Sequence, residues 1–415
     1  MSNINPHKLM VNGPVNVIRL EGSIDSIPKV IYLFMDYHIK VNFQTQCSNI
    51  FSEDVQKYFT RSFFELNKET NDKFDFFIEI YPSELSRVRK THYEQKEKYI
   101  EEVVKFFRKI FKFDPKKNKV SVNKLFKNIR LHYLDVRDYY ELSASYQVDI
   151  INKLVKKFTR TNNVNVRDLE TIIDQLDLIS DHLDLIIKTL EAPVSSVSSI
   201  STSPNIIKYK HTYTFEQSPI TYLSNKIKAS YAHNHVKKIL NSLLKDSIQN
   251  FISITDLIDT IKKKLISYIK LLSESEGKLT LDKNTTYLYT YGLSSYTMRN
   301  MITDIANSIE QLIVEKFVEY FARFTDIYFL RRFLDKDYIT NAITYTGGMH
   351  SNTYVHILVN LFDFKITHIS HSKLANMSKL NDEIRKGSAM EIQRLLLPEE
   401  LNQCSDLTHF PKNFS

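Results

Sequence analysis

Two short segments that lie far apart in the sequence each end in a histidine. The first, from Val30 to His38, is an apolar run that ends in Asp-Tyr-His, and the second, from Ile343 to His350, ends in Gly-Gly-Met-His. The chain holds only 7 glycines in 415 residues, so two adjacent glycines before a histidine mark close backbone contact or a positive φ. Strands that each end in a histidine are how an α/β protein assembles a site at the carboxyl ends of its strands.

Acidic side chains follow two further predicted strands. Glu79 lies at the end of an apolar strand, and a later strand runs into Asp135, Arg137 and Asp138. Because side chains alternate along a strand, the acid and the histidine of the Asp-Tyr-His segment share one face. Histidines grouped with carboxylates can hold a divalent metal ion, which lowers the pKa of a bound water and makes it a nucleophile. Without a metal, the same groups can act as a general acid and a general base.

The sequence therefore predicts three groups of functional residues. The expected catalytic residues are His38, Glu79 and His350. The expected ligands of a divalent metal ion, the one cofactor that the pattern suggests, are Asp36, His38, Asp135 and His350. The expected substrate-binding residues are Arg137, Asp138 and Tyr345, of which the arginine would bind an anionic group.

Each of these residues also has a structural interpretation. His38 could be a strand-end histidine bonded to neighbouring backbone, and Glu79 could cap the following helix. The charged residues at 135–138 could form an ion pair, because arginine favours forked contacts with carboxylates. His350 is the hardest to explain in this way, because the adjacent glycines have no other evident role. Cys47 could be a nucleophile, but no paired base is visible for it.

The pattern of strands and helices predicts an α/β fold with a mostly parallel sheet that is split by a large helical insertion. Strands are expected at 15–20, 29–38, 74–81, 128–138, 338–346 and 364–370. Helices are expected at 52–66 with Ser52 as N-cap, at 84–112, 352–362 and 389–397, and within the Leu- and Ile-rich segments 141–192 and 225–335.

The predicted organisation follows from where the α/β character stops and returns. An N-terminal arm, 1–14, precedes the first half of the α/β core at 15–140. A helical insertion at 141–336 carries a Ser-rich loop at 193–204, and the second half of the core follows at 337–372. The last residues, 373–415, are predicted to form a polar tail with one short helix.

Composition limits the function classes. The absence of both common glycine-rich phosphate loops argues against nucleotide binding by those routes. The net charge of +8 is spread along the chain, so it permits weak nucleic-acid contact without the basic stripe of a dedicated binder. Neither a membrane-spanning apolar run nor a signal segment occurs, so a soluble, non-secreted protein is expected. Two cysteines, Cys47 and Cys404, are too few for a disulfide framework or a zinc finger and suit a reducing compartment.

The order of these elements resembles the superfamily of erythromycin-esterase-like, ChaN-like and Tiki/TraB proteins. Members open with a strand ending in Gly-Glu-x-His, continue with a Gln-containing helix start and a strand ending in Glu, and carry a Gly-rich turn with a histidine near the C-terminus. The matching segments here are Phe34 to His38, Gln44 and Gln46, Phe77 to Glu79, and Gly347 to His350. The resemblance implies that the histidines and the glutamate of these motifs are functional, with Asp36 in place of the usual glutamate. The helical segment has no counterpart in it.

A second resemblance concerns the source of the chain. The AT-rich residue bias and the phrase from Arg19 to Gly22 look like an uncharacterised protein family of giant DNA viruses, which implies a location in the host cytoplasm or the virion. The leading hypothesis is a divergent hydrolase with metal- or base-assisted chemistry. The alternative is a non-catalytic structural or interaction protein, such as a virion component, whose helical insertion binds protein partners or a second copy of the chain.

Overall fold

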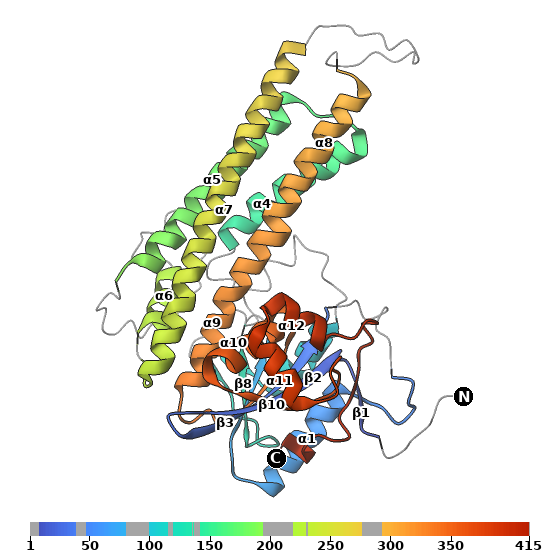
Figure 1. Cartoon of the computed structure of the whole chain (residues 1–415), viewed down its shortest axis with the longest axis vertical. Coiled ribbons are helices and arrows are strands. Elements are labelled where there is room, and N and C mark those ends of the chain that lie inside the picture. Colours follow the sequence, from blue (N-terminus) through green and yellow to red (C-terminus); the bar gives the residue numbers. More distant parts are fainter. Residues whose placement is uncertain are drawn as a thin grey trace.

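The computed structural model describes residues 8–38, 47–79, 99–114, 119–134, 136, 142–193, 219–229, 231–275 and 293–414. Figure 1 shows an α/β body from which a long bundle of helices projects. The predicted helical stretch 84–98, the Ser-rich loop from 194 onward, and Gln44 and Gln46 lie outside the described residues.

A six-stranded sheet forms the centre of the body, in the order β10-β2-β3-β9-β5-β8. The strands are β2 (Asn16–Ile24), β3 (Ile27–Asp36), β5 (Phe74–Ile78), β8 (Ile129–Tyr133), β9 (Asn341–Gly347) and β10 (Lys365–Ile369). β3, β9, β5 and β8 form a parallel row, while β2 pairs antiparallel with β3 and with β10. The sheet is mostly parallel, and the α/β class predicted from the sequence is confirmed.

The parallel row brings three strand ends to one edge of the sheet. β9 pairs with β3 on one side and with β5 on the other, so Asp36 lies opposite Gly347 and Ile78 lies opposite Tyr345. These segments form strands because they can be covered on both faces: every residue of β5 is buried, and so is the second half of β3. Polar residues that follow β3, β5 and β9 must therefore share one edge.

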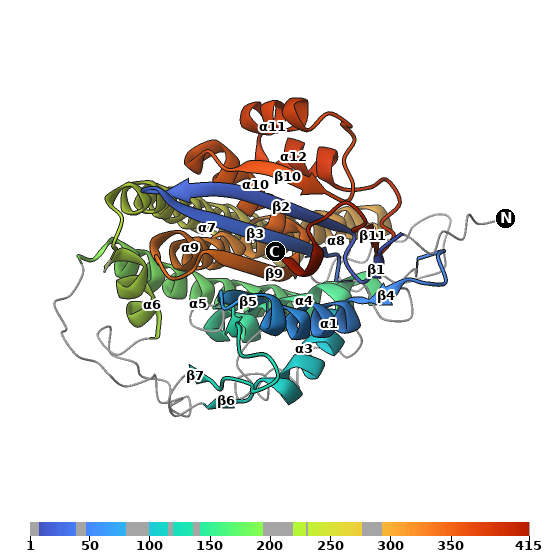
Figure 2. The ribbon, with the colours of Figure 1, turned by 90° about the horizontal axis from the view of Figure 1, so that it is seen from below.

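Two apolar cores cover the two faces of the sheet. The helices nearest to it are α1 (Val55–Glu69), α3 (Tyr99–Ile110) and α10 (Gly348–Phe362). α1 and α3 enclose an aromatic core that includes Phe59, Phe63 and Phe107, whereas α10 and the helical bundle cover the opposite face. Figure 2 shows β10, β2, β3, β9 and β5 side by side from below, with the bundle behind them. A short hairpin of β6 (Phe113–Asp114) and β7 (Lys119–Val120) follows α3.

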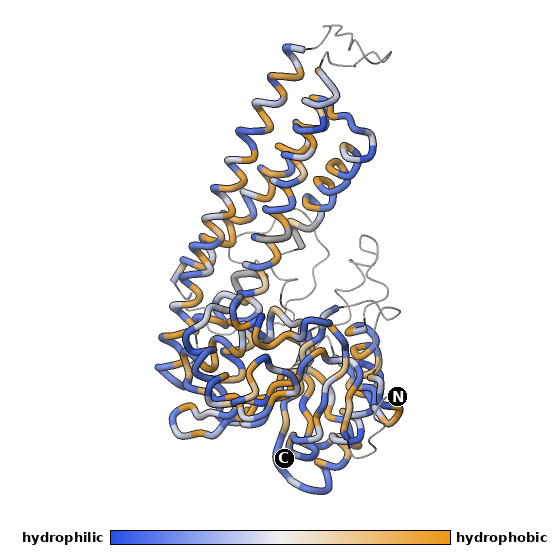
Figure 3. Tube along the Cα trace, turned by 45° about the vertical axis from the view of Figure 1, so that its right-hand side comes forward, coloured by the Kyte–Doolittle hydropathy of each residue, from blue (hydrophilic) through white to orange (hydrophobic). Residues whose placement is uncertain are grey.

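The helices of the bundle lie between β8 and β9 in chain order. They are α4 (Leu142–Thr161), α5 (Val166–Glu191), α6 (Pro219–Lys228), α7 (Asn234–Ser275), α8 (Ser295–Glu310), the π-helical segment η4 (Gln311–Val318) and α9 (Glu319–Asp335). Leucines and isoleucines at spacings of three and four form their buried faces, as from Leu176 to Ile186 in α5. Figure 3 shows the resulting alternation of apolar and polar residues along each helix. Of the helices described, none is both long and apolar enough to cross a membrane.

The segment predicted as a polar tail holds more structure than the one expected helix. It contains α11 (Met377–Lys386), α12 (Ala389–Leu396), β11 (Cys404–Asp406) and the 3₁₀ turn η5 (Lys412–Phe414). β11 joins β1 (Met10–Asn12) and β4 (Glu53–Asp54) in a small three-stranded sheet. The apolar residues that anchor α11 are few, Leu380 and Ile384 being its buried ones, so the sequence signal for that helix is weak.

The N-cap of α1 is Asp54, which corrects the prediction of Ser52. The Asp54 carboxylate accepts a hydrogen bond from the backbone N–H of Gln56 at 2.9 Å. Ser52 lies before β4, and its hydroxyl oxygen accepts from the side-chain amide of Asn12 at 2.9 Å. Pairing of β4 with β1 delays the start of the helix until after Asp54.

Cys47 and Cys404 form a disulfide, which corrects the expectation drawn from the number of cysteines. The two residues are 357 positions apart in the sequence, and their Cα atoms are 5.1 Å apart. The sequence does not reveal this pairing because it depends on β11 lying beside β1, which places Cys404 opposite Asn12. A bonded Cys47 has no free thiolate to act as a nucleophile. The expectation of a reducing compartment loses its basis as well.

Candidate functional site

Three polar side chains meet at the edge where β3, β5 and β9 end. His38 lies two residues after β3, Glu79 directly follows β5, and His350 lies in the first turn of α10, which follows β9. Nε2 of His350 is 3.2 Å from Oε1 of Glu79, and Nε2 of His38 is 3.7 Å from the same oxygen. The structure thus brings together the three residues that the sequence predicts to be catalytic, with the glutamate between the two imidazoles.

A carboxylate holds the other ring nitrogen of each histidine. Nδ1 of His38 donates to Oδ2 of Asp36 at 2.6 Å, and Nδ1 of His350 donates to Oδ1 of Asp326 at 2.5 Å. Because a carboxylate only accepts, each Nδ1 carries a proton and each ring is fixed with Nε2 toward Glu79. These five residues, Asp36, His38, Glu79, Asp326 and His350, are called the histidine cluster below.

His38 folds back onto the strand from which it comes. Its φ is 54°, a left-handed conformation that is uncommon for a residue other than glycine. The turn lets the backbone N–H of His38 donate to Oδ2 of Asp36 at 2.6 Å, the same oxygen that holds the ring. His38 does lie at a strand end, but its ring bonds to the carboxylate of Asp36 and not to neighbouring backbone, as the structural interpretation had it.

Burial separates His38 from the other members of the cluster. The side chain of His38 is 33% exposed, whereas Asp36 is fully covered and Glu79 is 5% exposed. His350 and Asp326 are 6% and 2% exposed. Among the described residues of the cluster, His38 is the one that solvent or a substrate reaches.

Tyr345 supports the cluster from within the sheet. It is fully buried, and its hydroxyl donates to Oδ1 of Asp36 at 3.1 Å. Asp36 therefore accepts from Tyr345 through one oxygen and from His38 through the other. This place fits a residue that positions Asp36, rather than the substrate contact predicted from the sequence.

Asp326 is the member of the cluster that the sequence analysis missed. It comes from α9, a helix that is almost entirely apolar and buried around that position. A charged residue between Phe324, Thr325 and Ile327 in such a helix is costly unless it is paired, and this is the signal that could have singled it out. The predicted carboxylates lie at strand ends, whereas a helix of the bundle supplies Asp326.

The histidine cluster lies directly against the backbone of Gly347, so a larger residue there would displace its side chains. A Cβ added there would lie 2.9 Å from Nε2 of His38 and 3.3 Å from Oε2 of Glu79. Its backbone N–H donates to that same glutamate oxygen at 2.7 Å. Glu79 thus accepts from the N-cap residue of α10 as well as facing both histidines, whereas the chain that directly follows Glu79, where it was expected to cap a helix, lies outside the described residues. The close approach expected from the Gly-Gly pair occurs at its first glycine.

Burial and charge act in opposite directions on these groups. Burial would lower the pKa of His38, but its hydrogen bonds to Asp36 and Glu79 raise that pKa to about 9. Burial would also lower the pKa of His350, yet the charges of Glu79 and Asp326 raise it well above its ordinary value. Burial would raise the pKa of Glu79, but the two histidines hold it well below its usual range. At neutral pH both imidazoles are therefore cations and Glu79 is an anion.

Asp326 behaves differently from Glu79. Its burial outweighs the charge of His350 and the hydrogen bonds from His350 and Tyr354, so its pKa is raised. The nearby negative charge of Glu79 acts in the same direction as burial. The cluster thus combines one strongly acidic carboxyl group with one that holds its proton more readily, and the two flank the same imidazole.

Three predicted residues take no part in this description. Asp135, Arg137 and Asp138, expected as a metal ligand and substrate-binding residues, lie outside the described residues. Over the ranges that are described, no three His, Cys, Asp or Glu side chains are grouped so that they could hold a metal ion. The divalent metal ion therefore remains a prediction.

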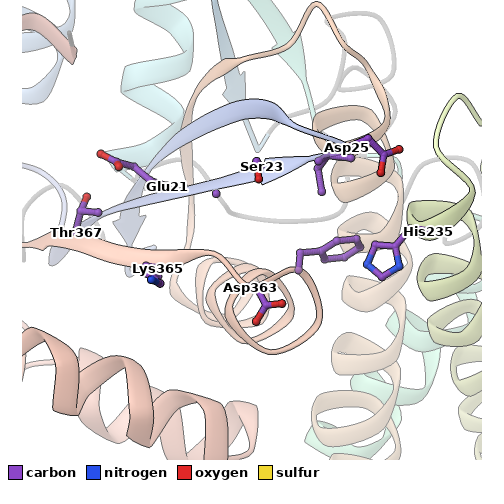
Figure 4. A pocket seen from close by; sticks show the side chains of 10 residues that line it. Glu21, Ser23, Asp25, His235, Asp363, Lys365 and Thr367 are labelled. Atoms are coloured by element: carbon purple, nitrogen blue, oxygen red, sulfur yellow. The ribbon is translucent and has the colours of Figure 1, made fainter.

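A cavity of about 520 Å³ lies at the opposite end of β2 from the histidine cluster. Figure 4 shows Glu21, Ser23 and Asp25 along β2 and its turn, with His235 of α7 and Lys365 of β10 across from them. The residues that line it do not include any member of the histidine cluster. The cavity is not among the sites predicted from the sequence.

Comparison with known proteins places the chain among viral sequences. The family model described as "Family of unknown function (DUF5847)" matches residues 9–415. Two proteins of Acanthamoeba polyphaga mimivirus align over the whole of both chains: Uncharacterized protein R706 at 50% identity and Uncharacterized protein R161 at 39%. Uncharacterized protein R160 of the same virus is 35% identical over 97% of each chain. No solved structure matches the chain. These relatives support the giant-virus origin expected from the sequence.

Proposed function

We propose that this chain, which belongs to the DUF5847 family of unknown function, is a divergent hydrolase that works by acid–base catalysis. One observation carries the proposal: His38 and His350 face Glu79 from two sides, and a buried carboxylate fixes each imidazole at Nδ1. Groups that transfer protons need such fixed orientation and shifted pKa values. The order of motifs, similar to that of erythromycin-esterase-like and ChaN-like proteins, supports the same class of reaction.

His38 is the proposed proton donor because it is the exposed member of the cluster. With a pKa of about 9 it is a cation at neutral pH, so once a water molecule has added to the carbonyl carbon, Nε2 can give a proton to the leaving oxygen or nitrogen as its bond to that carbon breaks. The neutral ring, still held at Nδ1 by Asp36, then takes up the proton that the added water has to lose. One water is consumed, and His38 regains its starting charge.

Glu79 and His350 are positioning residues in this proposal. The charge of Glu79 keeps the ring of His38 in place and favours its cationic form. His350 and the Asp326 behind it hold Glu79 from the buried side. The fixed dipoles and charges need no rearrangement during proton transfer, which is the condition under which electrostatic stabilisation is most effective.

Substitution of the two histidines tests the proposal. Purified full-length protein is screened with chromogenic esters, lactones and amides, and His38→Gln and His350→Gln are compared with the wild type on any substrate that is cleaved. We expect a loss of rate of about 10²- to 10⁴-fold for His38→Gln, the usual worth of a general acid. Far-UV circular dichroism and thermal unfolding check that each variant is folded.

His368→Gln is the matched control. His368 is half-buried on β10, away from the strand ends that carry the cluster, so its replacement should leave the rate unchanged. A rate that survives in His38→Gln, or one that falls equally in His368→Gln, contradicts the proposal. So does a wild-type protein that cleaves none of the three substrate classes.

Dependence on a divalent metal ion is a separate proposal, with Asp36, His38, Asp135 and His350 as the predicted ligands. Its support is that imidazoles oriented by carboxylates are common among metal ligands. Elemental analysis by inductively coupled plasma mass spectrometry, on the wild type, His38→Ala and His350→Ala, tests it. One metal ion per wild-type chain that is lost in both variants favours metal-assisted hydrolysis, and a metal content that does not depend on the histidines removes it.

A role as a structural or interaction protein, for instance in the virion or the host cytoplasm, is the alternative proposal. Its support is the projecting bundle, where Leu178, Ile266 and Tyr296 are 50%, 55% and 75% exposed. Protein partners or a second copy of the chain would bind there, and weak nucleic-acid contact would follow from the positive net charge. Light scattering coupled to size exclusion, at low and high salt, distinguishes self-association from a monomer.

A further inference from the structure

Residues 404–414, here called the C-terminal strap, run from the small sheet to the aromatic core. At its start β11 pairs with β1, and the backbone N–H of Leu407 donates to the carbonyl of Leu9 at 2.8 Å. Near its end the side-chain amide of Asn413 donates to Glu69, the last residue of α1, at 2.9 Å. The strap is thus fastened at both ends to segments far from it in the sequence.

Phe414, near the end of the strap, fills a space among the aromatic rings beneath the sheet. It is 2% exposed, and its ring centroid lies 5.0 Å from that of Tyr32, 5.6 Å from that of Tyr58 and 6.1 Å from that of Phe34. Edge-to-face contacts of this kind are favourable, and a ring of this size leaves a large cavity when it is withdrawn. The aromatic core is therefore complete only when the strap is in place.

The same aromatic core supports one side of the histidine cluster. The ring of Phe59 lies 6.2 Å from the ring of Phe414 and 6.2 Å from the ring of Tyr345. Tyr345 donates to Asp36, and Asp36 holds His38. Phe34, which also contacts Phe414, lies two residues before Asp36 on the same face of β3. Continuous contacts therefore join the strap to His38.

A single covalent bond fastens the start of the strap. Cys404, the first residue of the strap, is bonded to Cys47, whose backbone N–H donates to Oδ1 of Asn12 at 2.6 Å. Asn12 lies opposite Cys404 in the pairing of β1 with β11, so the bond and the hydrogen bonds reinforce one another. Both cysteines are partly exposed, so a small dithiol can reach them.

We propose that the Cys47–Cys404 disulfide is a redox latch that holds the C-terminal strap and, through Phe414 and Tyr345, the Asp36–His38 side of the histidine cluster. A dithiol reduces the bond by thiol–disulfide exchange: the disulfide gains two electrons and two protons and becomes two thiols, and the dithiol closes to a cyclic disulfide. The strap is then held by non-covalent contacts alone, and Phe414 leaves the core more often. Control of His38 by this route rests on the proposed function, whereas the latch itself does not.

Hydrogen–deuterium exchange measured by mass spectrometry tests the latch without any substrate. Full-length protein is compared before and after treatment with dithiothreitol, and thiol labelling of the intact protein verifies the state of the cysteines. We expect exchange at least tenfold faster in peptides from the strap after reduction. Peptides that contain Tyr345 or Asp36 should also exchange faster, and peptides from α5 in the bundle should not change.

A variant that leaves the disulfide intact tests the coupling by itself. Phe414→Ala removes the ring but not the bond, so it should accelerate exchange around Tyr345 and Asp36 in the oxidised protein. Phe64→Ala is the matched control, because Phe64 is an α1 aromatic whose side chain is 45% exposed.

Three results would overturn the inference. Two free thiols in the native, untreated protein would mean that there is no latch. Unchanged exchange in the strap after verified reduction would mean that the bond does not hold it. Faster exchange in the strap without any change around Tyr345 would remove the coupling to the cluster. Since none of these measurements uses catalysis, they stand or fall independently of the loss of activity expected for His38→Gln.

Discussion

Gly347 is the residue on which the geometry of the histidine cluster depends most directly. The nearest atoms to a Cβ at this position belong to the ends of the His38 and Glu79 side chains, which can move. We therefore expect Gly347→Ala to cost little stability but to push His38 away from Glu79, with a loss of hydrolytic rate of about 10- to 100-fold, since misplaced groups transfer protons poorly. The rate and the unfolding midpoint in urea measure the two effects.

The neighbouring glycine supplies the control for this change. A Cβ at Gly348 would meet nothing closer than the carbonyl oxygen of Asp36 at 3.9 Å, which is an ordinary contact. Gly348→Ala should therefore keep the wild-type rate, and alanine suits a helix at least as well as glycine. Equal effects of the two substitutions would show that the cluster does not depend on close approach to Gly347.

The charge of His38 should be visible in the pH dependence of stability. Its pKa is about 9 in the folded chain and about 6.5 when unfolded, so its contacts with Asp36 and Glu79 favour the cationic form. This contribution is fully present below pH 6.5 and is lost as the pH rises through 9. Urea unfolding of the wild type and His38→Gln should therefore give a difference that shrinks over this range. A difference that grows with pH would contradict the direction of the shift.

Residue types at strand ends were enough to predict that His38, Glu79 and His350 lie together, because an apolar run followed by a polar residue fixes which edge of the sheet that residue reaches. They could not reveal Asp326, which reaches the cluster from a helix. The pairing of Cys47 with Cys404 was equally hidden, because it depends on the packing of a segment predicted to be a polar tail. Long-range contacts of this kind leave no periodic signal in the chain.

At the level of elements, Lys29 joins the start of β3 to the end of α9. It is 1% exposed, and its ammonium group donates to the carbonyl oxygens of Phe333, Lys336 and Ile339 at 3.0, 2.9 and 2.7 Å. Lys29→Met would remove the ammonium donor from all three carbonyls, of which that of Lys336 keeps the backbone N–H of Ile339. We expect a loss of about 2–4 kcal/mol in the free energy of unfolding, measured in urea, because unsatisfied buried acceptors are costly.

An exposed lysine provides the comparison for Lys29. Lys365, on the edge strand β10, is exposed, so Lys365→Met should change the free energy of unfolding by less than about 0.5 kcal/mol. Similar losses in the two variants would mean that the three carbonyls find other donors, such as water, when the ammonium group is removed.

The elements that the sequence predicted best are those with long apolar runs or a clear helical period. β3, β5, α5 and α7 belong to this group. The strands are runs of apolar residues, as burial on both faces requires, and the helices carry apolar residues at helical spacing along one face. The predictions failed where local pairing decides the boundary, as at Asp54, or where few apolar residues anchor a helix, as in α11. The π-helical turns of η4 have no signature in the residues that form them.

In the whole molecule, the bundle and the α/β body share the histidine cluster. Helical periodicity predicted the bundle helices but not their placement, because it says which face of a helix is buried and not what covers that face. α9 enters the body beside α10, and this contact carries Asp326 to His350. A substitution that changed how α9 packs beside α10 would therefore disturb the histidine cluster even though it altered no strand.

The helices α8, η4 and α9 follow one another directly along the chain and form one long rod. From Ser295 at its outer end to Asp326 near the α/β body, the rod runs for about 47 Å, at roughly 1.5 Å per residue. A rigid tilt of one degree about the end near the body would move the outer end by about 0.8 Å, as follows from that length. Asp326 lies near the inner end of this length, so a rigid tilt of the rod would move its carboxylate, and with it the contact to His350, far less than the outer end.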